Sequence, residues 1–289
     1  MKFLKFILDS IIFFINLINK LFSYLFKLSF IGYFKEQLEK KCYIEKKILD
    51  KEISFFCPNK TTEWRVKTFF KKEPETIEWI NNFVNDKSLV LWDIGANIGL
   101  YSIYASLRFD RINVVAFEPS TSNLRVLSRN ISINSLCEKI KIVSQPLNDE
   151  KYKFSIFNES SFQEGGALNT FKEKFNFTGK DTEFENRYYL LGTSINQLLD
   201  DKVLEIPDYI KIDVDGIEHL ILMGAEKYLN NKKIKSILIE VNENFERQFT
   251  KIKNIMENSN FKLVKKERNE DFYQISDFKK MYNYIYVKK

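Results

Sequence analysis

LVLWDIGANIGLYS, residues 89–102, is the stretch that decides the fold predicted for this chain. Its first four residues are the continuous apolar run that is typical of a parallel strand covered on both faces. Gly95 and Gly99 follow, and glycine permits both the positive φ of a tight turn and close packing of the next helix. The stretch therefore predicts a strand, a glycine turn and a helix start, which together form a nucleotide-type pocket.

The residues of this turn narrow the choice of ligand. The dinucleotide fingerprint G-x-G-x-x-G is absent, because Asn97 and Leu100 stand where glycines are required, so NAD and FAD are disfavoured. Asp93 places a carboxylate directly before the turn, which suits a ligand with an ammonium or sulfonium group, such as S-adenosylmethionine (SAM). Asp93 is expected either to order the turn or to meet that ammonium group. The residues predicted to hold the methionine end of SAM are Asp93, Gly95, Ala96, Asn97 and Gly99.

Further strands and helices alternate after the turn. A second apolar strand is predicted over residues 112–117 and ends at Glu118 and Pro119. A carboxylate at that strand end, about 20 residues past the turn, can accept both ribose hydroxyls, so Glu118 is expected on the ribose. Apolar runs over 140–143, 206–214, 234–241, 261–265 and 282–287 complete a doubly wound, seven-stranded α/β sheet. Residues 151–191 break the pattern and are expected to form an antiparallel strand and a substrate loop, or alternatively an unconstrained insertion.

Composition sets broader limits. The net charge of +6 comes mainly from scattered lysines, so nucleic-acid binding is not predicted. Cys42, Cys57 and Cys137 are isolated and odd in number, so neither a disulfide framework nor a zinc site is expected, and a reducing cytoplasm is the default location.

The N-terminal segment is dense in Phe, Ile and Leu. Its main polar residues recur at spacings of four and seven, which places them on one stripe of a helix; they are Lys5, Asp9, Asn16, Lys20 and Lys27. The preferred interpretation is an interfacial amphipathic anchor, and the alternative is a helix that packs on its own domain or on a partner. A transmembrane span and a signal peptide rank lower, because no uncharged window is long enough and no small-residue cleavage site follows.

Four motifs resemble those of the FkbM family of SAM-dependent methyltransferases: TEWRVKTFFKKEPETIEWI, WDIGANIGLYS, FEPS and IKIDVDGIEHLILMGAE. The similarity covers residues 50–289. It implies a class I methyltransferase sheet of six parallel strands and one antiparallel strand, with a methyl group transferred to an oxygen, often a hydroxyl of a sugar or polyketide. In related folds the loop after the third strand meets the adenine, which implies Asn148 and Asp149 here. The expected organisation is a helix over 1–34, a lead-in over 35–85 and a methyltransferase domain over 86–289; residues 34–48 are expected to form a surface helix or linker.

The acceptor side is predicted at the end of the fourth strand. Asp213 and Asp215 point the same way there, toward the crevice at the carboxyl ends of the strands. Asp215 and Glu218 also have the spacing of a capping box, which is the preferred role for Glu218. His219, the single histidine, is a candidate base because a helix N-terminus favours its neutral form, although packing is the commoner role of a lone histidine. Asp213 is the alternative base.

Two weaker candidates complete the prediction. Carboxylates and amides near residues 240–244 resemble a magnesium site only in composition, so no metal is predicted. Arg65 and Glu73 are expected either to close over the acceptor or to form a surface ion pair. The predicted function is SAM-dependent O-methylation of a glycan, lipid-linked or other small-molecule acceptor, in the cytoplasm at the inner face of the membrane. The alternatives are an N-methyltransferase and a membrane-associated SAM-binding or interaction protein without transfer activity.

Overall fold

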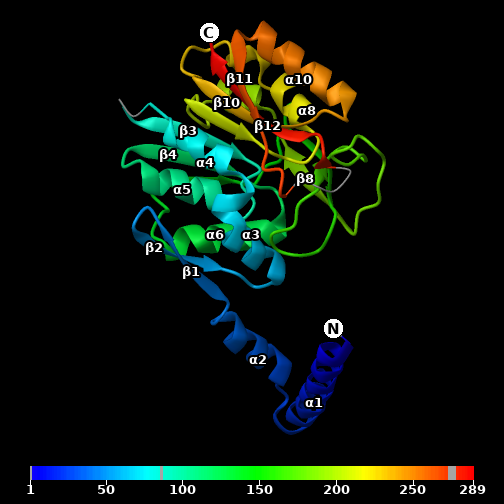
Figure 1. The fold of residues 1–289 in the computed structure, drawn as a ribbon. Helices are drawn as coiled ribbons and strands as arrows, with labels where there is room; N and C mark the ends of the chain where they lie inside the picture. The colour runs from blue at the N-terminus through cyan, green and yellow to red at the C-terminus, as the bar shows by residue number, and fades with distance from the viewer. Residues whose placement is uncertain (1, 85–86, 273–277) are drawn as a thin grey trace. The chain divides into compact units, whose positions relative to one another are not determined.

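The computed structural model in Figure 1 describes residues 2–84, 87–272 and 278–289. The chain divides into two compact units, Met1–Ile44 and Glu45–Lys289. The first unit contains helices α1 (Lys2–Phe26) and α2 (Phe30–Glu39). Where one helix was expected over residues 1–34, the structure has two, because the Ser29 side chain accepts the Gly32 N–H and caps a new helix.

The second unit is built on a seven-stranded sheet with the order β11-β12-β10-β9-β3-β4-β5. Its strands are β3 (Leu89–Ile94), β4 (Ile112–Phe117), β5 (Ile140–Val143), β9 (Tyr209–Ile212), β10 (Ser236–Asn242), β11 (Phe261–Glu267) and β12 (Met281–Lys288). Strand β12 is antiparallel to both neighbours, and the other adjacent pairs are parallel. The predicted fold, a class I methyltransferase sheet, is confirmed.

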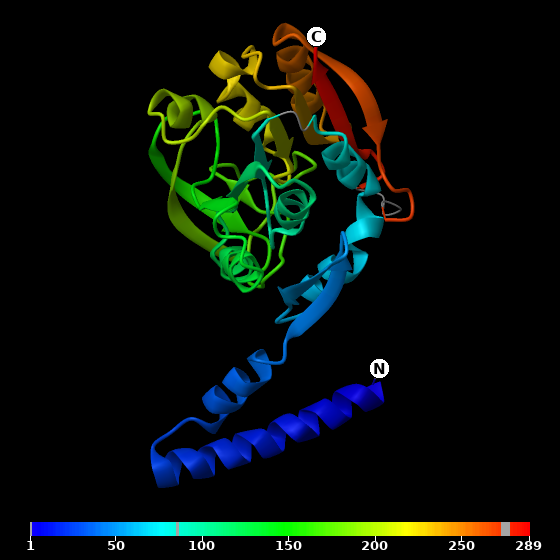
Figure 2. The same cartoon turned by 90° about the vertical axis from the view of Figure 1, so that its left-hand side faces the viewer.

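Helices cover both faces of this sheet, which makes it doubly wound. One face packs against α7 (Ile195–Asp200), α8 (Glu218–Met223), α9 (Glu226–Leu229) and α10 (Glu246–Asn258). The other helices of the unit are α3 (Lys60–Lys72), α4 (Pro74–Asn81), α5 (Leu100–Arg108) and α6 (Thr121–Ile133). In Figure 2, α4 (cyan) lies beside the orange and red strands β11 and β12. Trp79 of α4 donates a hydrogen bond to Ser236 of β10 at 2.9 Å, which ties the lead-in to the sheet.

Two smaller antiparallel sheets lie outside the central sheet. β1 (Tyr43–Ile48) and β2 (Lys51–Phe56) form a hairpin, so the helix or linker expected over residues 34–48 is corrected to α2 followed by β1. β6 (Lys153–Glu159) is the predicted antiparallel strand of the insertion. It pairs with β7 (Thr170–Phe171) and β8 (Asn186–Gly192), neither of which was predicted.

Candidate active site

The glycine turn lies between β3 and α5, next to the end of β9. Gly95, Asn97 and Gly99 have φ values of 85°, 51° and 89°. A Cβ on Gly95 would lie 1.8 Å from the backbone oxygen of Asp213, so glycine is required by the neighbouring strand end as well as by the turn. A Cβ on Gly99 would lie 2.6 Å from a methyl carbon of Leu127 in α6. The close packing predicted for Gly99 is therefore against α6 and not against the sheet.

Asp93 is buried beneath this turn. Its Oδ2 accepts a hydrogen bond from the Ser102 hydroxyl in α5 at 2.6 Å, and the residue is 1% exposed. Burial raises the pKa of its carboxyl group. Asp93 is not among the described residues that line the adjacent cavities. Of its two predicted roles, ordering the turn fits these contacts and meeting a ligand does not.

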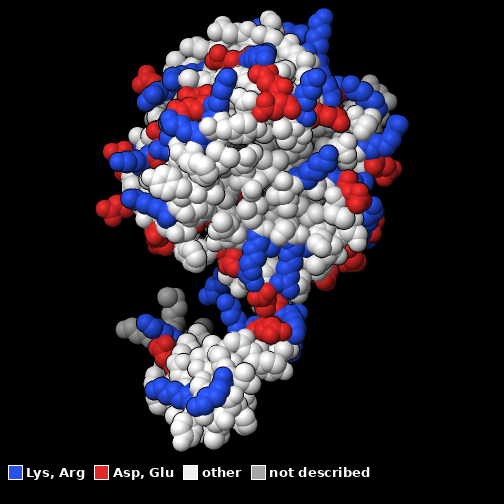
Figure 3. Space-filling model, turned by 180° about the vertical axis from the view of Figure 1, so that it is seen from behind, with Lys and Arg blue, Asp and Glu red and all other residues white. Residues whose placement is uncertain are grey.

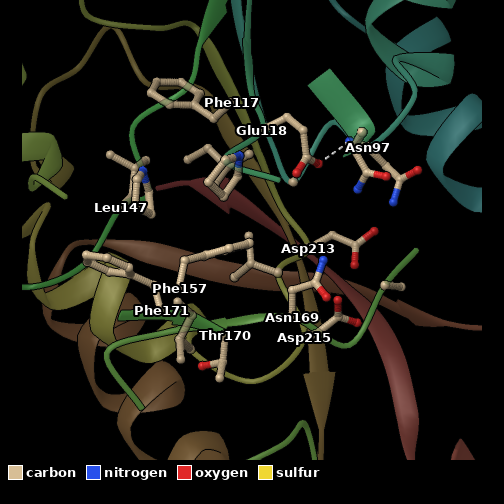
Figure 4. A pocket seen from close by; sticks show the side chains of 18 of the residues that line it. Asn97, Phe117, Glu118, Leu147, Phe157, Asn169, Thr170, Phe171, Asp213 and Asp215 are labelled. Atoms are coloured by element: carbon tan, nitrogen blue, oxygen red, sulfur yellow. Dashed lines mark hydrogen bonds between the residues drawn. The ribbon is translucent and has the colours of Figure 1, made fainter. Parts of the chain in front are cut away.

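Glu118 ends β4 and faces a cavity. Its Oε2 accepts the Asn97 N–H and its Oε1 accepts the Ser120 N–H, both at 2.8 Å (Figure 4). A carboxylate oxygen can accept more than one hydrogen bond, so both oxygens retain the capacity to accept a ligand hydroxyl. Burial raises the pKa of Glu118 to about 7, although its hydrogen bonds oppose this shift.

The cavity beside Glu118 has an apolar end and a polar end. It spans about 580 Å³ of space, part of it open to solvent, at the carboxyl ends of β3, β4 and β9. Phe117, Leu147 and Phe157 lie at one end, and Asn97 and Glu118 lie at the other (Figure 4). Pro119 also lines it. This arrangement suits a ligand with a flat apolar group at one end and several polar groups at the other.

The loop after β5 reaches this cavity through residues 145–147, and this corrects the predicted adenine contact. Asn148 and Asp149 are not among the described residues that line the cavity. Asn148 Oδ1 instead accepts the Glu150 N–H at 2.6 Å, and Asp149 lies 3.7 Å from the ammonium nitrogen of Lys172. These two polar side chains order the loop, while the apolar Leu147 faces the cavity.

The insertion forms one wall of the cavity and is held by the Gly165–Gly166 dipeptide. The carbonyl of Gly165 accepts Arg65 Nε–H of α3 at 2.6 Å, and its N–H donates to Asn123 Oδ1 of α6 at 2.8 Å. The carbonyl of Gly166 accepts Asn97 Nδ2–H of the turn at 2.7 Å. The predicted substrate loop is thus attached to three separate elements.

A buried network of charges lies under the turn, and the sequence did not predict it. Lys211 of β9 is 2% exposed and donates to Asp213 Oδ2 at 2.7 Å. Its ammonium nitrogen also lies 5.1 Å from the centre of the Tyr101 ring. The Tyr101 hydroxyl donates to Glu73 Oε2 at 2.8 Å, and Glu73 is paired with Lys72. The one signal in the sequence was a lysine inside the apolar strand YIKI, since a lysine is rarely buried without a partner.

The surface ion pair considered for Arg65 and Glu73 is therefore corrected. Glu73 is 2% exposed and pairs with Lys72, whereas Arg65 binds the Gly165 carbonyl. Both residues line a small cavity on the other side of the turn, which Ala96 and Lys211 also line.

A larger cavity adjoins the donor side, and five residues line both cavities: Gly95, Asn97, Ala167, Asp213 and Asp215. The apolar and aromatic residues that line the larger cavity are Trp64, Leu168, Phe272, Phe278 and Met281. The carboxyl groups of Asp213, Asp215 and Glu240 also line it. The aromatic residues were missed because they come from α3 and from the segment before β12, which are about 200 residues apart in the sequence.

The three carboxyl groups of this cavity differ in charge state. Burial favours the neutral form of Asp213, but Lys211 and Lys72 outweigh it and lower its pKa. Burial and the charge of Asp213 raise the pKa of Asp215 to about 6, and they raise that of Glu240 well above its ordinary value. At neutral pH Asp213 is ionised in its ion pair, and Asp215, with a pKa of about 6, is mostly ionised and can still accept a proton. The raised pKa of Glu240 favours its neutral form.

The hydrogen bonds of Asp215 and Glu218 show which of the two residues caps the start of α8. Asp215 Oδ2 accepts the Leu168 N–H at 2.6 Å and does not cap its own helix. Glu218 accepts the Gly216 and Val214 N–H groups, so the preferred capping role of Glu218 fits the structure.

The position of His219 favours packing over catalysis. It is 1% exposed, its ring lies edge-on to Phe245 at 5.9 Å, and it is not among the described residues that line these cavities. Burial, with the charges of Lys251 and Arg247, lowers its pKa to about 4. The proposed base role of His219 is therefore withdrawn.

Comparison with known proteins identifies the family. The profile of the methyltransferase FkbM domain matches residues 93–263, which is more than half of the chain. The chain belongs to the FkbM methyltransferase domain family. The resemblance expected from the four motifs is thereby confirmed, and SAM is the cofactor.

Curated relatives of this FkbM methyltransferase differ widely in length. Methyltransferase sdnD of Sordaria araneosa is 27% identical over 154 residues, covering 47% of this chain and 60% of that protein. The AMB antimetabolite synthetase AmbE of Pseudomonas aeruginosa is 27% identical over 186 residues, covering 53% and 8%. The chain thus spans less than two thirds of either relative.

Solved structures with a similar fold include two methyltransferases. Precorrin-6y C5,15-methyltransferase of Geobacter metallireducens has 15% identity and a TM-score of 0.43, with 76% of this chain and 89% of that chain covered. A putative rRNA methylase of Clostridium thermocellum has 8% identity and a TM-score of 0.46, with coverages of 75% and 95%.

The donor cavity of this FkbM methyltransferase fits SAM. The apolar end has the character that an adenine requires, and Glu118 offers two oxygens to a ribose. Gly95 and Asn97 of the turn line the polar end. Among residues 2–84, 87–272 and 278–289, no group of three or more His, Cys, Asp or Glu residues is placed to hold a metal ion.

The raised pKa of Glu118 leads to a prediction about SAM binding. Ribose hydroxyls donate hydrogen bonds, so they stabilise the ionised carboxylate and bind less well to the protonated form. Because the pKa in the empty site is about 7, the association constant should fall about tenfold per pH unit below that value and level off above it. Titration calorimetry measures this. Glu118→Gln should bind SAM more weakly and lose the pH dependence due to this residue; identical pH profiles for both proteins would contradict the prediction.

Proposed function

We propose that this FkbM methyltransferase transfers the methyl group of SAM to a hydroxyl oxygen of a glycan, lipid-linked or other small-molecule acceptor. The observation that carries the proposal is Asp215, a carboxyl group with a pKa of about 6 in the cavity that adjoins the donor side. A hydroxyl must lose a proton when its oxygen is methylated, and a base near neutral pKa serves that purpose.

In the donor site, different residues bind different parts of SAM. When bound, SAM supplies a methyl group activated by its sulfonium. Phe117, Leu147 and Phe157 would hold the adenine by apolar contact, and Glu118 would hold the ribose. The turn from Gly95 to Asn97 would hold the methionine end, and Gly95 and Asn97 also line the second cavity.

The acceptor site combines positioning with proton removal. Trp64, Phe272 and Phe278 offer ring faces on which a sugar or another flat apolar face can stack. Asp215 accepts the hydroxyl proton through the oxygen that is not bonded to Leu168. Asp213 stays ionised beside Lys211 and favours positive charge nearby, while the Glu240 carboxyl group lines the same cavity and is available to hydrogen-bond the acceptor.

We also propose that the acceptor is not a nucleic acid and that the protein works in the cytoplasm at a membrane surface. On the face shown in Figure 3, basic and acidic side chains are interspersed over the second unit, which supports the first statement. The exposed apolar side chains of α1 support the second.

Transfer of labelled methyl groups tests this function. We expect the full chain, incubated with SAM labelled in its methyl group and with lipid, polysaccharide and small-molecule fractions of a cell extract, to form a methyl ether. Heat-inactivated protein and Glu118→Ala serve as controls. A product methylated on nitrogen would show that the protein is an N-methyltransferase and not an O-methyltransferase. SAM binding with no labelled product in any fraction would favour a SAM-binding protein without transfer activity.

A further inference from the structure

The first unit exposes an apolar surface along the whole of α1. Lys5–Phe26 are long and apolar enough by composition to cross a membrane, and none of their most apolar window is buried in the structure. Six side chains near the centre of the apolar face are each at least 43% exposed: Phe3, Ile11, Phe14, Ile18, Leu21 and Leu25. In Figure 3 this unit is mainly white, with a few basic side chains. A soluble surface rarely carries so continuous an apolar face without a partner.

The polar residues of α1 form a narrow stripe opposite this face. At 3.6 residues per turn, Lys5, Asp9, Asn16, Lys20 and Lys27 fall within about 60° of one another, whereas the apolar residues span about 260°. The seam of a helix pair is narrower than this apolar sector, so a second copy of α1 would leave much of the sector uncovered. A bilayer surface covers a sector of that width.

Asn19 fixes the orientation of α1 through its contact with α2. Its Oδ1 accepts the Ile31 N–H at 3.0 Å and the Ser29 hydroxyl at 3.4 Å. The ring of Phe22 packs against those of Phe26 and Phe30, with centroids 4.8 and 5.6 Å apart. The start of α2 is therefore attached at Asn19, about 10 Å before the end of α1 at 1.5 Å per residue.

A spanning helix conflicts with this attachment. If Lys5–Phe26 crossed the bilayer, Asn19 and the start of α2 would lie about 10 Å inside it, together with the charge of Lys20. If α1 lies flat, the polar stripe and the start of α2 stay at the headgroup level. The four lysines of residues 2–27 outnumber the single acidic residue, Asp9, which favours anionic lipid.

We propose that α1 and α2 form an in-plane membrane hairpin that binds bilayers containing anionic lipid, with the apolar face of α1 in the acyl region and its lysines among the headgroups. The inference rests on the membrane association in the proposed function, and it is independent of methyl transfer.

Vesicle flotation of the full chain tests the proposal. We expect at least about tenfold stronger binding to phosphatidylcholine vesicles with about 30% phosphatidylglycerol than to phosphatidylcholine alone. Phe14→Glu, at the centre of the apolar face, should weaken binding at least about tenfold. Asn16→Glu makes the same charge change on the polar stripe and should weaken it less than about threefold.

Three outcomes would overturn the proposal. Equal loss of binding in both variants, with wild-type protein that resists alkaline extraction, would indicate a spanning helix. Absence of vesicle binding, with a lipid-free dimer that Phe14→Glu dissociates, would indicate a second copy. Unchanged binding of Phe14→Glu would exclude the apolar face as the contact. Methyl transfer to a soluble acceptor fraction, measured on the same proteins, separates each of these outcomes from failure of the proposed activity.

Discussion

Replacing Asp215 with asparagine is expected to lower kcat about 100- to 1000-fold, a far larger change than the accompanying one in the Kd for SAM. Asparagine has the size of aspartate, and its Oδ1 can still accept the Leu168 N–H that holds Asp215 at 2.6 Å. It cannot take a proton from a hydroxyl at neutral pH. The site therefore keeps its shape and loses its base.

Single-turnover kinetics with a labelled acceptor fraction, combined with calorimetry for SAM, measure the two quantities. In the wild type the rate should rise with pH through about 6 as Asp215 ionises, and Asp215→Asn should lose that rise.

Asp149→Asn is the matched control, because Asp149 pairs with Lys172 outside the cavity and its change should leave the rate unaltered. Asp213→Asn should instead lower stability, since it weakens the pairing of the buried Lys211. A rate for Asp215→Asn within about fivefold of wild type would remove Asp215 as the base.

Gly95→Ala is expected to lower the free energy of unfolding by at least about 3 kcal/mol or to prevent folding. The added Cβ would lie 1.8 Å from the backbone oxygen of Asp213, and backbone atoms cannot move aside as a flexible side chain can. The φ of 85° is unfavourable for alanine in addition. Both effects act where β3 and β9 end side by side, so the donor site should be lost along with stability.

Urea denaturation followed by tryptophan fluorescence, together with expression of soluble protein, measures this effect. Gly32→Ala is the control, because the nearest atom to its added Cβ would be at 3.4 Å and its φ is not positive. That change should leave unfolding of the second unit unaltered. A Gly95→Ala protein with a wild-type denaturation midpoint would show that the two strand ends can separate without cost.

The strands that the sequence predicted most clearly are those in which nearly every residue is buried. β3 is buried at every position, so its residues form an unbroken apolar run, and the turn and Glu118 follow from the strand ends. β1 and β8 were missed because their burial varies along the strand, and the sequence over them does not form a clear apolar pattern. The fold therefore could be predicted in its core and not in its partly exposed additions.

The candidate site divides in the same way. The turn and ribose residues of the donor site are near one another in the sequence, within Gly95–Glu118, and could be predicted as a motif, whereas Leu147 and Phe157 lie outside it and were missed. The acceptor walls come from Trp64, Phe272 and Phe278, which only the complete fold brings together. The loop after β5 shows another limit of sequence-based prediction. Its polar side chains were expected to face the ligand, but Asn148 hydrogen-bonds the backbone of its own loop, and the apolar Leu147 faces the cavity instead.

The attachment of Gly165–Gly166 has a consequence for redesign. Because Arg65, Asn97 and Asn123 bind this dipeptide from three elements, the insertion cannot be exchanged as an independent module. A chimaera that imports another relative's insertion would need to preserve the dipeptide and its three anchoring side chains. Residues 180–185, beyond the strand β7, are expected to tolerate variation better, because they do not line the donor or acceptor cavity within the described part of the chain. Engineering of acceptor choice would therefore begin with Ala167 and Leu168, which line the acceptor cavity directly after the anchored pair.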